Sequence, residues 1–412
     1  MKNFVIFGVS GDLSQRYILP ALGNLAASGH HFNYFGFSRQ SVDQSTINFS
    51  QNIKYFTGNY DYQGLSKMSK FLTPDTIFYF SIPTSYELIV SLVSGLLQHH
   101  LIGDHTRLVI EKPFGTDYQS AQKLMDYLTA SVGQDKVFLV DHYLSKELVR
   151  NLISLRFANP IIHQLWNKEH IARINIIAVE SAGIGTRSRY YDQIGAIRDM
   201  IQNHCLQLLA ISTMSEPASF DQSSFSLEKL KIINHLVLTQ KIKKNVSIGQ
   251  YHGYLQESGV DPQSLTETLA QISFEINLPH WRGVPITITT GKKMDQKLTE
   301  INIIFKKARS LKLWKEAHSL NPNVLSINLS PHADIFLSLN SSFQPHNQLP
   351  QPQNLHLGSL SVSPSSAYES VILDILHGVN INSPSFAEII AQWKIVDKII
   401  HLPHLRDKLF YY

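Results

Sequence analysis

Five short apolar runs, separated by longer segments of helical periodicity, constrain the fold of this chain more than any other feature. The intervening segments 19–27, 86–99 and 120–131 repeat apolar residues at helical spacing. Alternation of strand and helix predicts a parallel sheet wound with right-handed crossovers. No element is predicted between Arg39 and Phe78, where the sequence is polar and weakly periodic. The five predicted strands are 4–7, 34–37, 77–80, 108–110 and 137–140.

From about residue 143 the pattern changes to long helical segments and then to strands of alternating polarity. The alternation predicts an antiparallel sheet with one covered face. Segment 340–355 is rich in Gln, Asn, Pro and Ser, which indicates an exposed loop or a ragged sheet edge. We therefore predict an α/β Rossmann-type parallel-sheet domain over 1–142 and a larger α+β domain with an antiparallel sheet over 143–412. The helices expected in the second domain are 146–157, 196–214, 366–376 and 385–400, and the strands are 270–276, 285–289, 300–305 and 335–339.

Length and composition narrow the class of protein. A chain of 412 residues exceeds one ordinary hydrophobic core, which favours two domains. The net charge of +4 gives no indication of nucleic-acid binding, although it suits an anionic ligand. Cys205 is the only cysteine, so an internal disulfide is excluded and a reducing compartment is expected. We expect no signal peptide, no membrane span and a cytoplasmic location, because no apolar segment has the required length.

A glycine-containing loop follows the first predicted strand and precedes a helix. Glycines let a backbone approach a dinucleotide pyrophosphate closely, and N–H groups at a helix start bind it. The loop has a Gly-x-x-Gly pattern and not the full three-glycine fingerprint, so a strand-to-helix turn without ligand is the alternative. The candidate cofactor-binding residues of the loop are Gly8, Ser10, Gly11, Asp12 and Leu13.

The second predicted strand ends at Arg39, where NAD enzymes usually place an acidic residue. A guanidinium there suits the 2′-phosphate of NADP through bidentate hydrogen bonds. A solvated surface arginine is the alternative interpretation. The nearby Asp43 leaves NAD possible.

Two further strands end in charged clusters. Glu111-Lys-Pro-Phe-Gly115 follows the fourth strand and places an ammonium group at the carboxyl edge of the sheet. Asp141-His-Tyr-Leu-Ser-Lys146 follows the fifth, and its imidazole, phenol and ammonium groups could together bind a phosphate dianion. The alternative for each residue alone is an exposed loop group.

Segment Arg198-Asp-Met-Ile-Gln-Asn-His204 has a helical pattern. Asp199 and His204 are five residues apart, so both can border one broad face of a helix. A single histidine on an apolar helix is more often a core or capping group than a catalytic base. The adjacent Cys205 fits a small buried residue better than a nucleophile.

These motifs, in this order, resemble those of the glucose-6-phosphate dehydrogenase family. The resemblance runs from residue 4 to about 400. It includes Gly8-Val-Ser-Gly-Asp-Leu13, the Glu111 pentad, Asp141-His-Tyr-x-x-Lys146 and the Arg198 segment. Trp281-Arg-Gly-Val-Pro and Gly291-Lys292 match two further elements of the family.

The resemblance implies oxidation of C1 of D-glucose 6-phosphate to 6-phospho-D-glucono-1,5-lactone, with hydride transfer to NADP, the first step of the oxidative pentose phosphate pathway. His204 would be the general base and Asp141 its orienting carboxylate. A homodimer or homotetramer and no metal site are expected. The implied substrate ligands are Lys112, His142, Tyr143, Lys146, Glu180, Asp199, Lys292 and Lys297. The implied cofactor contacts are the glycine loop, Arg39, Pro83 and Lys112.

The chain departs from the family pattern at several positions. Ser14 and Tyr17 stand where the family has alanine and lysine, and Thr84 stands where it usually has a second proline. The chain is also shorter than most members. These departures keep two alternatives open: a catalytically degenerate paralogue that binds nucleotide or sugar phosphate, and a related NAD(P)-dependent sugar dehydrogenase.

Overall fold

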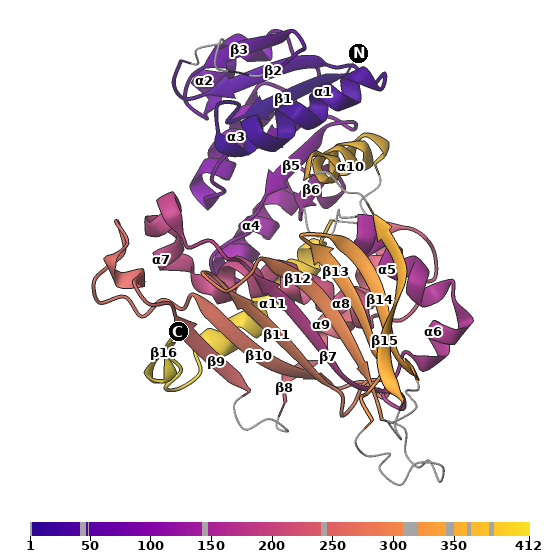
Figure 1. The fold of residues 1–412 in the computed structure, drawn as a ribbon. Coiled ribbons are helices and arrows are strands. Elements are labelled where there is room, and N and C mark those ends of the chain that lie inside the picture. The colour runs from indigo at the N-terminus through magenta and orange to yellow at the C-terminus, as the bar shows by residue number, and fades with distance from the viewer. Residues whose placement is uncertain are drawn as a thin grey trace. The chain divides into compact units, whose positions relative to one another are not determined.

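A computed structural model describes residues 2–41, 47, 49–141, 147–239, 245–307, 320–342, 350–360, 364–378 and 383–412 (Figure 1). The chain folds into two compact units. The first comprises Met1–Ser145, Pro217–Leu227 and Ser363–Trp393, and the second comprises Lys146–Glu216, Glu228–Val362 and Lys394–Tyr412. The boundary at 142/143 expected from the sequence stays a prediction.

The first unit is built on a six-stranded parallel sheet with the order β3-β2-β1-β4-β5-β6. All five predicted strands are present. The sixth, β3, lies in the polar connection where no strand is predicted, because this edge strand is only half-buried and lacks an apolar run. The chain reverses direction of winding between β1 and β4, the point where doubly wound sheets bind ligands. The strands are β1 (Asn3–Phe7), β2 (Asn33–Ser38), β3 (Ile53–Thr57), β4 (Thr76–Phe80), β5 (Arg107–Glu111) and β6 (Val137–Val140).

The crossover helices of this unit have recognisable start signals. The side chains of Asp61, Ser85 and Asp117 each accept a backbone N–H at a helix start. Asp117 and Ser120 form a reciprocal capping box at the last of these helices. The helical segments are η1 (a π-helix, Ser14–Ile18), α1 (Leu19–Ala27), α2 (Tyr62–Ser69), α3 (Tyr86–Gln98), α4 (Tyr118–Ser131), η3 (Gln134–Lys136) and α10 (Pro364–His377).

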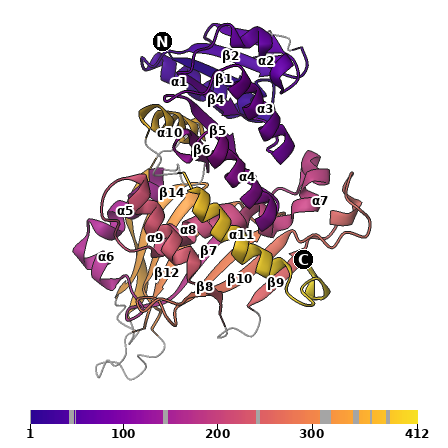
Figure 2. The ribbon, with the colours of Figure 1, turned by 180° about the vertical axis from the view of Figure 1, so that it is seen from behind.

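Helix α10 comes from far along the chain and packs beside α1 on the first sheet (Figures 1 and 2). Right-handed winding places the crossover helices of β4, β5 and β6 on the opposite face from α1. The α1 face over those strands would otherwise be bare, and α10 covers it. The buried cluster beneath it contains Tyr79, Val109 and Phe138 of the sheet and Tyr368 and Ile372 of the helix.

The second unit contains a ten-stranded sheet with the order β15-β14-β13-β12-β7-β11-β10-β9-β16, and β8 pairs with β10. The sheet is mixed and not purely antiparallel, because β7 pairs in parallel with β11 and β16 pairs in parallel with β9. The strands are β7 (Ile171–Val179), β8 (Leu236–Leu238), β9 (Val246–Gln250), β10 (Leu269–Ile276), β11 (Pro285–Gly291), β12 (Leu298–Phe305), β13 (Val324–Ser330), β14 (Ala333–Ser342), β15 (Gln351–Leu360) and β16 (Phe410–Tyr411).

Of the two structures expected for segment 340–355, its described residues form mainly the sheet edge and not a loop. Strand β14 continues to Ser342, and β15 begins at Gln351. Strand β15 lies at the edge of the sheet, and Leu355 and Leu357 are exposed there. An edge strand with little buried surface has no need of an apolar run, so its polar composition conceals it.

Helices α5 and α8 lie on one face of the large sheet (Figure 2). The segment η5 packs on the central strands β7 and β11. The residues of α9 and α11 fall partly in each unit. The helical segments are α5 (Glu147–Phe157), α6 (Pro160–Leu165), η4 (Gly185–Arg187), α7 (Ser188–Ala196), η5 (a π-helix, Ile197–Cys205), α8 (Leu206–Thr213), α9 (Gln222–Asn234), η6 (Tyr254–Gln256), α11 (Phe386–Ile400) and η8 (Arg406–Lys408).

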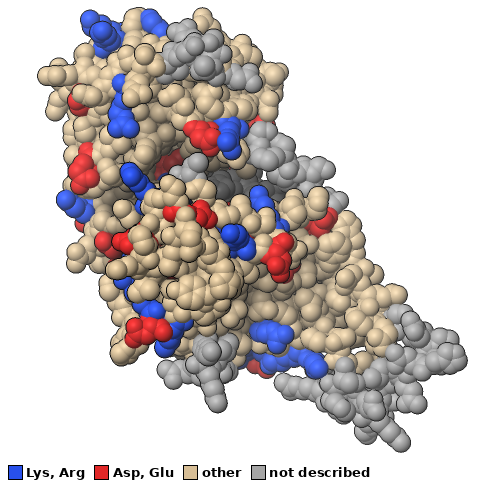
Figure 3. Space-filling model, turned by 60° about the vertical axis from the view of Figure 1, so that its left-hand side comes forward, with Lys and Arg blue, Asp and Glu red and all other residues tan. Residues whose placement is uncertain are grey.

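The surface carries charges of both signs. Figure 3 shows Lys and Arg side chains among Asp and Glu side chains on the face drawn. Among the helices of the described residues, none is both long enough and apolar enough to cross a bilayer.

Candidate active site

The glycine loop after β1 is held between three strands of the first sheet. Gly8 has φ +83°, and a Cβ there would lie 2.2 Å from the carbonyl oxygen of Ser81. The N–H of Gly8 donates to the carbonyl of Phe37 at 2.8 Å, and the N–H of Gly11 donates to the carbonyl of Gly8 at 2.9 Å. Only glycine satisfies both the backbone angle and this close approach.

Ser14, which replaces the family alanine, closes the same loop from inside. Its hydroxyl is fully buried and lies 2.9 Å from both the Gly8 carbonyl and the Ser81 hydroxyl. Ser14 is placed to donate its single hydroxyl hydrogen to either oxygen, one at a time. The outer rim carries the exposed Ser10 and Asp12, and Asp12 pairs with Arg16 at 2.7 Å.

The structure thus brings Gly8, Ser10, Gly11, Asp12 and Leu13 together at the start of a helix. The helix begins at Asp12, and N–H groups in a first turn have no partner within the helix. Such groups are suited to the phosphates of a dinucleotide.

Arg39 directly follows β2 and is exposed. The buried hydroxyl of Ser38 donates to the carbonyl of Gln40 at 2.6 Å and fixes the turn that carries it. The alternative ribose ligand Asp43 lies outside the described residues.

The loops after β4 and β5 are joined by a hydrogen bond. The hydroxyl of Thr84, where the family usually has proline, donates to the carbonyl of Pro113 at 2.7 Å. The indole N–H of Trp393 donates to the carbonyl of Phe114 at 2.8 Å. These bonds hold the backbone directly after Pro83, which is exposed, and after Lys112, which is half-buried and precedes a cis proline.

Asp141 directly follows β6 and is buried, with 3% of its surface exposed. Its strand neighbour Val140 pairs with Glu111, so the two acids lie at adjacent strand ends. Burial raises the pKa of Glu111 to about 7, while Tyr79 and Lys112 act to lower it and Asp141 acts to raise it further.

The phosphate ligands expected from the same motif, His142, Tyr143 and Lys146, lie outside the described residues. Their role stays a prediction.

In the second unit, the segment with Asp199 and His204 is a π-helix at the start of the predicted helix 196–214. In a π-helix, hydrogen bonds between residues i and i+5 bring two residues five apart onto one side of the helix. The sequence pattern predicts that Asp199 and His204 border one face, but it does not predict a π-helix. The Asp199 side chain is 8% exposed, and His204 is fully buried. The predicted pairing of His204 with Asp141 of the first unit stays a prediction.

The helix that continues from this π-helix has its last carbonyl groups occupied by three large side chains. Arg156 donates to the carbonyls of Ile211 and Met214 at 2.5 and 2.6 Å. The indole N–H groups of Trp166 and Trp281 donate to the carbonyls of Ser212 and Thr213, at 2.7 and 2.8 Å. Trp281 of the Trp-x-Gly-Val-Pro motif therefore anchors the helix that follows Asp199 and His204.

Three predicted substrate ligands converge in the second unit. The ammonium of Lys292 forms a short ion pair with Glu180 and lies 3.6 Å from a carboxylate oxygen of Asp199. Strands β7 and β11 end side by side and supply Glu180 and Lys292, while η5 supplies Asp199. An ammonium between two carboxylates gives donors and acceptors for a polyhydroxylated ligand.

The sequence interpretation missed two members of this cluster. Tyr191 places its ring 5.5 Å from the Lys292 ammonium, and Arg187 lies 3.9 Å from Asp199. The adjacent basic and aromatic residues in 187–191 are a signal that could have indicated them. Lys297 is exposed in the turn before β12, and no contact described here joins it to Lys292. Ala178, Met200, Thr290 and Gly291 pack around Glu180, Tyr191 and Lys292 and leave no room there for a water molecule.

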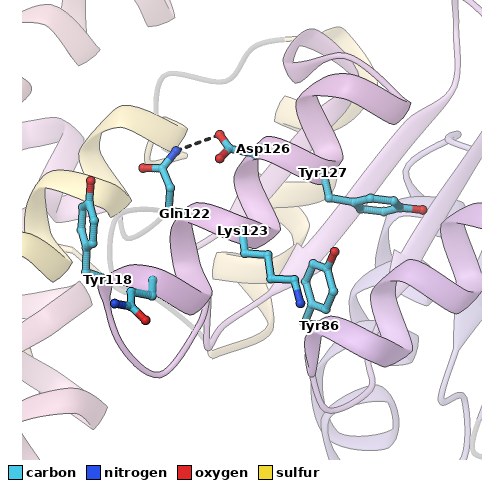
Figure 4. A pocket seen from close by; sticks show the side chains of 7 residues that line it. Tyr86, Tyr118, Gln122, Lys123, Asp126 and Tyr127 are labelled. Atoms are coloured by element: carbon cyan, nitrogen blue, oxygen red, sulfur yellow. Dashed lines mark hydrogen bonds between the residues drawn. The ribbon is translucent and has the colours of Figure 1, made fainter.

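An open pocket lies between α3 and α4 of the first unit (Figure 4). In it, the Lys123 ammonium sits 4.0 Å from the centre of the Tyr86 ring, and Gln122 donates to Asp126 at 2.8 Å. None of the predicted site residues lines this pocket. Its open, solvent-facing walls do not enclose a ligand, so size alone does not locate the active site.

Comparisons with known proteins agree with the motifs. Residues 153–412 match the model of the glucose-6-phosphate dehydrogenase C-terminal domain. Residues 5–57 and 38–151 match that of the glucose-6-phosphate dehydrogenase NAD binding domain. A glucose-6-phosphate 1-dehydrogenase of Chlamydia muridarum is 32% identical over 96% of this chain and 89% of its own length.

Solved structures show the same fold. The crystal structure of glucose-6-phosphate 1-dehydrogenase from Mycobacterium avium has a TM-score of 0.88 at 26% identity and covers 100% of this chain and 93% of that one. A glucose-6-phosphate dehydrogenase in complex with its substrate glucose-6-phosphate has a TM-score of 0.87 at 29% identity, covering 100% and 94%. On these matches and on the residues at its strand ends, the chain belongs to the glucose-6-phosphate dehydrogenase family.

Proposed function

We propose that this protein is an NADP-dependent glucose-6-phosphate 1-dehydrogenase, which oxidises C1 of D-glucose 6-phosphate to 6-phospho-D-glucono-1,5-lactone. The observation that carries the proposal is the convergence of Glu180, Asp199 and Lys292 in a chain that belongs to this family. In the reaction the C1–H bond breaks as a hydride leaves, and the C1 hydroxyl loses its proton, which leaves the lactone carbonyl.

The roles of the side chains follow from their chemistry. Neutral His204 accepts the proton of the C1 hydroxyl, and Asp141 orients its imidazole. Glu180 and Asp199 accept hydrogen bonds from sugar hydroxyls, while Lys292 donates to the sugar. The remaining ligands of the phosphorylated sugar are His142, Tyr143, Lys146, Lys112 and Lys297.

The glycine loop and the residues after β2 and β4 fit a dinucleotide. A Cβ at Gly8 would collide with the Ser81 carbonyl, and the helix that begins at Asp12 offers first-turn N–H groups to phosphates. Arg39 carries a guanidinium suited to a 2′-phosphate, with Pro83 and Lys112 as further contacts. NADP, when bound, supplies the hydride acceptor.

The assembly and location proposed for this enzyme follow from its family. We infer a homodimer or homotetramer in the cytoplasm. The lone cysteine, Cys205, is buried and suits a reducing compartment.

The test measures the increase in absorbance of reduced nicotinamide when purified protein is mixed with glucose 6-phosphate and either NADP or NAD. An increase in absorbance with glucose 6-phosphate but not with glucose supports the proposed substrate. An Arg39→Ala variant should lose roughly ten-fold or more in kcat/KM with NADP and little with NAD. Tight binding of glucose 6-phosphate without turnover would instead identify a degenerate paralogue.

A further inference from the structure

Tyr412 lies directly behind the Lys292 site. Strand β16 pairs in parallel with β9, and the N–H of Tyr412 donates to the carbonyl of Gln250 at 3.2 Å. The N–H of His252 donates to the carbonyl of Tyr412 at 2.8 Å. These backbone bonds fix the position from which the Tyr412 side chain extends.

The phenol of Tyr412 reaches the backbone of Lys292. Its oxygen lies 2.7 Å from the Lys292 carbonyl oxygen and 3.0 Å from the hydroxyl oxygen of Thr268. The same Thr268 hydroxyl accepts the N–H of Tyr251 at 2.9 Å. Its carbonyl accepts the N–H of Lys292, also at 2.9 Å.

The chemistry of these groups gives the hydrogen-bond chain one direction. A carbonyl has no hydrogen, so the Tyr412 phenol must donate to Lys292. Its oxygen is then free to accept, and the Thr268 hydroxyl is the donor. The chain runs from the Tyr251 N–H through Thr268 and Tyr412 to Lys292, and each bond polarises the next.

The aromatic ring of Tyr412 is also fixed. It packs edge-on against Tyr251 with ring centres 6.5 Å apart, at the border of a cluster with Tyr191 and Tyr254. The ring of Tyr191 in that cluster faces the ammonium of Lys292. Tyr412 therefore supports Lys292 in two ways. Its phenol holds the Lys292 carbonyl, and its ring packs beside the cluster whose Tyr191 ring faces the Lys292 ammonium.

The backbone at this point turns sharply. Lys292 is the first residue after β11, and Lys293 has φ +53°, a left-handed conformation that costs a non-glycine residue free energy. The conformation persists because its surroundings hold it: the N–H of Lys293 donates to the carbonyl of Ala182 at 3.0 Å, and Tyr412 holds the preceding carbonyl.

We propose that Tyr412 is a positioning residue for the substrate, which orients Lys292 between Glu180 and Asp199 through the hydrogen bond from its phenol to the Lys292 carbonyl. The inference rests on the proposed function, since it takes Lys292 as a ligand of glucose 6-phosphate. Tyr412 acts through Lys292 and need not touch the sugar itself.

The test compares Tyr412→Phe with Tyr411→Phe in the full chain. Both substitutions remove one hydroxyl from the same short segment, but Tyr411 is exposed and stacks on His252 with its ring. In Tyr412→Phe the KM for glucose 6-phosphate should rise roughly three- to ten-fold, with the KM for NADP unchanged. Tyr411→Phe should match the wild type in both.

A second pair of variants distinguishes loss of this hydrogen bond from a folding defect. Thr268→Val keeps the shape of the side chain but removes the donor to Tyr412, whereas Thr268→Ser keeps the hydroxyl. Valine should raise the KM for glucose 6-phosphate as Tyr412→Phe does, and serine should rescue it. Circular dichroism and thermal melting of all four variants report whether the fold is intact.

The outcomes separate two failures. A wild type that does not oxidise glucose 6-phosphate overturns the proposed function, and this inference with it. A wild type that is active overturns only the positioning role if Tyr412→Phe is indistinguishable from Tyr411→Phe. Equal increases in the KM values for sugar and NADP, with lower thermal stability, would also overturn it, because they indicate a general structural role.

Discussion

The phenol of Tyr79 donates a 2.5 Å hydrogen bond to the carboxyl group of Glu111, on the neighbouring strand of the first sheet. Both groups are buried, and Tyr79 packs beneath α10, where burial raises its pKa well above the usual value and keeps it a donor. The pair lies at the strand end that continues into Lys112. A buried acid at this place makes the stability of the protein depend on pH.

The first prediction follows from the raised pKa of Glu111, which burial shifts from 4.5 to about 7. The native state then binds a proton that the unfolded chain has released, so the free energy of unfolding falls as the pH rises through this window and levels off above it. Glu111→Gln removes the titration. Relative to wild type, it should gain on the order of 2 kcal/mol between about pH 5 and about pH 8.

Urea unfolding at a series of pH values measures this difference. Tyr79→Phe is the companion variant: the Tyr79 hydrogen bond lowers the pKa of Glu111, so its removal should extend the pH window upward. A stability difference between Glu111→Gln and wild type that does not change with pH would refute the assignment.

The second prediction concerns the glycine loop. Gly8→Ala adds a Cβ 2.2 Å from the Ser81 carbonyl at φ +83°, so the loop must move. We expect a loss of stability of several kcal/mol and loss of measurable NADP binding. Gly29→Ala is the matched control, because it has φ +96° but no atom within 4 Å of the added Cβ. If both variants melt at the same temperature, the close contact with Ser81 does not matter.

The third prediction tests the anchor at the end of α8. Arg156 is 4% exposed, and its two hydrogen bonds to carbonyls have no substitute in Arg156→Ala. Unfolding free energy should fall by roughly 3–5 kcal/mol. The exposed Arg189→Ala should change it by less than about 0.5 kcal/mol. Chemical denaturation of both variants measures the difference, and near-equal stabilities would show that solvent replaces the guanidinium.

The fourth prediction concerns His204, the proposed proton acceptor. His204→Ala should lower kcat by roughly 10² or more with little change in the KM for glucose 6-phosphate. The wild-type rate should fall as the pH is lowered, because a protonated imidazole cannot accept the proton. Cys205→Ala, which changes the neighbouring buried residue, should keep most of the turnover. Near-normal turnover of His204→Ala would exclude this histidine as the base.

The sequence was a good guide where local pattern decides the structure. Apolar runs mark every strand of the first sheet except β3, and α10 and α11 lie where their periodicity predicts them. The sequence predicts no strand at β3, a half-buried edge strand without an apolar run, and the four strands predicted for the second sheet leave out β7, β8, β9, β13 and β16. Neither the parallel pairing of β7 with β11 nor the π-helical form of η5 leaves a local signature.

The candidate site shows the same limit. Glu180, Asp199 and Lys292 could be named because motifs mark them, and the structure places them together. The contacts made by Arg156 and Tyr412 go to backbone carbonyls far away along the chain. A carbonyl acceptor has no residue identity, so such contacts leave no pattern in a sequence.

The position of α10 has a consequence for biosynthesis. A ribosome completes all six strands of the first sheet well before it reaches Pro364, and meanwhile the face with Tyr79, Val109 and Phe138 lacks its cover. This apolar aromatic surface therefore stays uncovered on the nascent chain while nearly the entire second sheet is synthesised. Until α10 is synthesised, this surface is open to aggregation and to binding by chaperones.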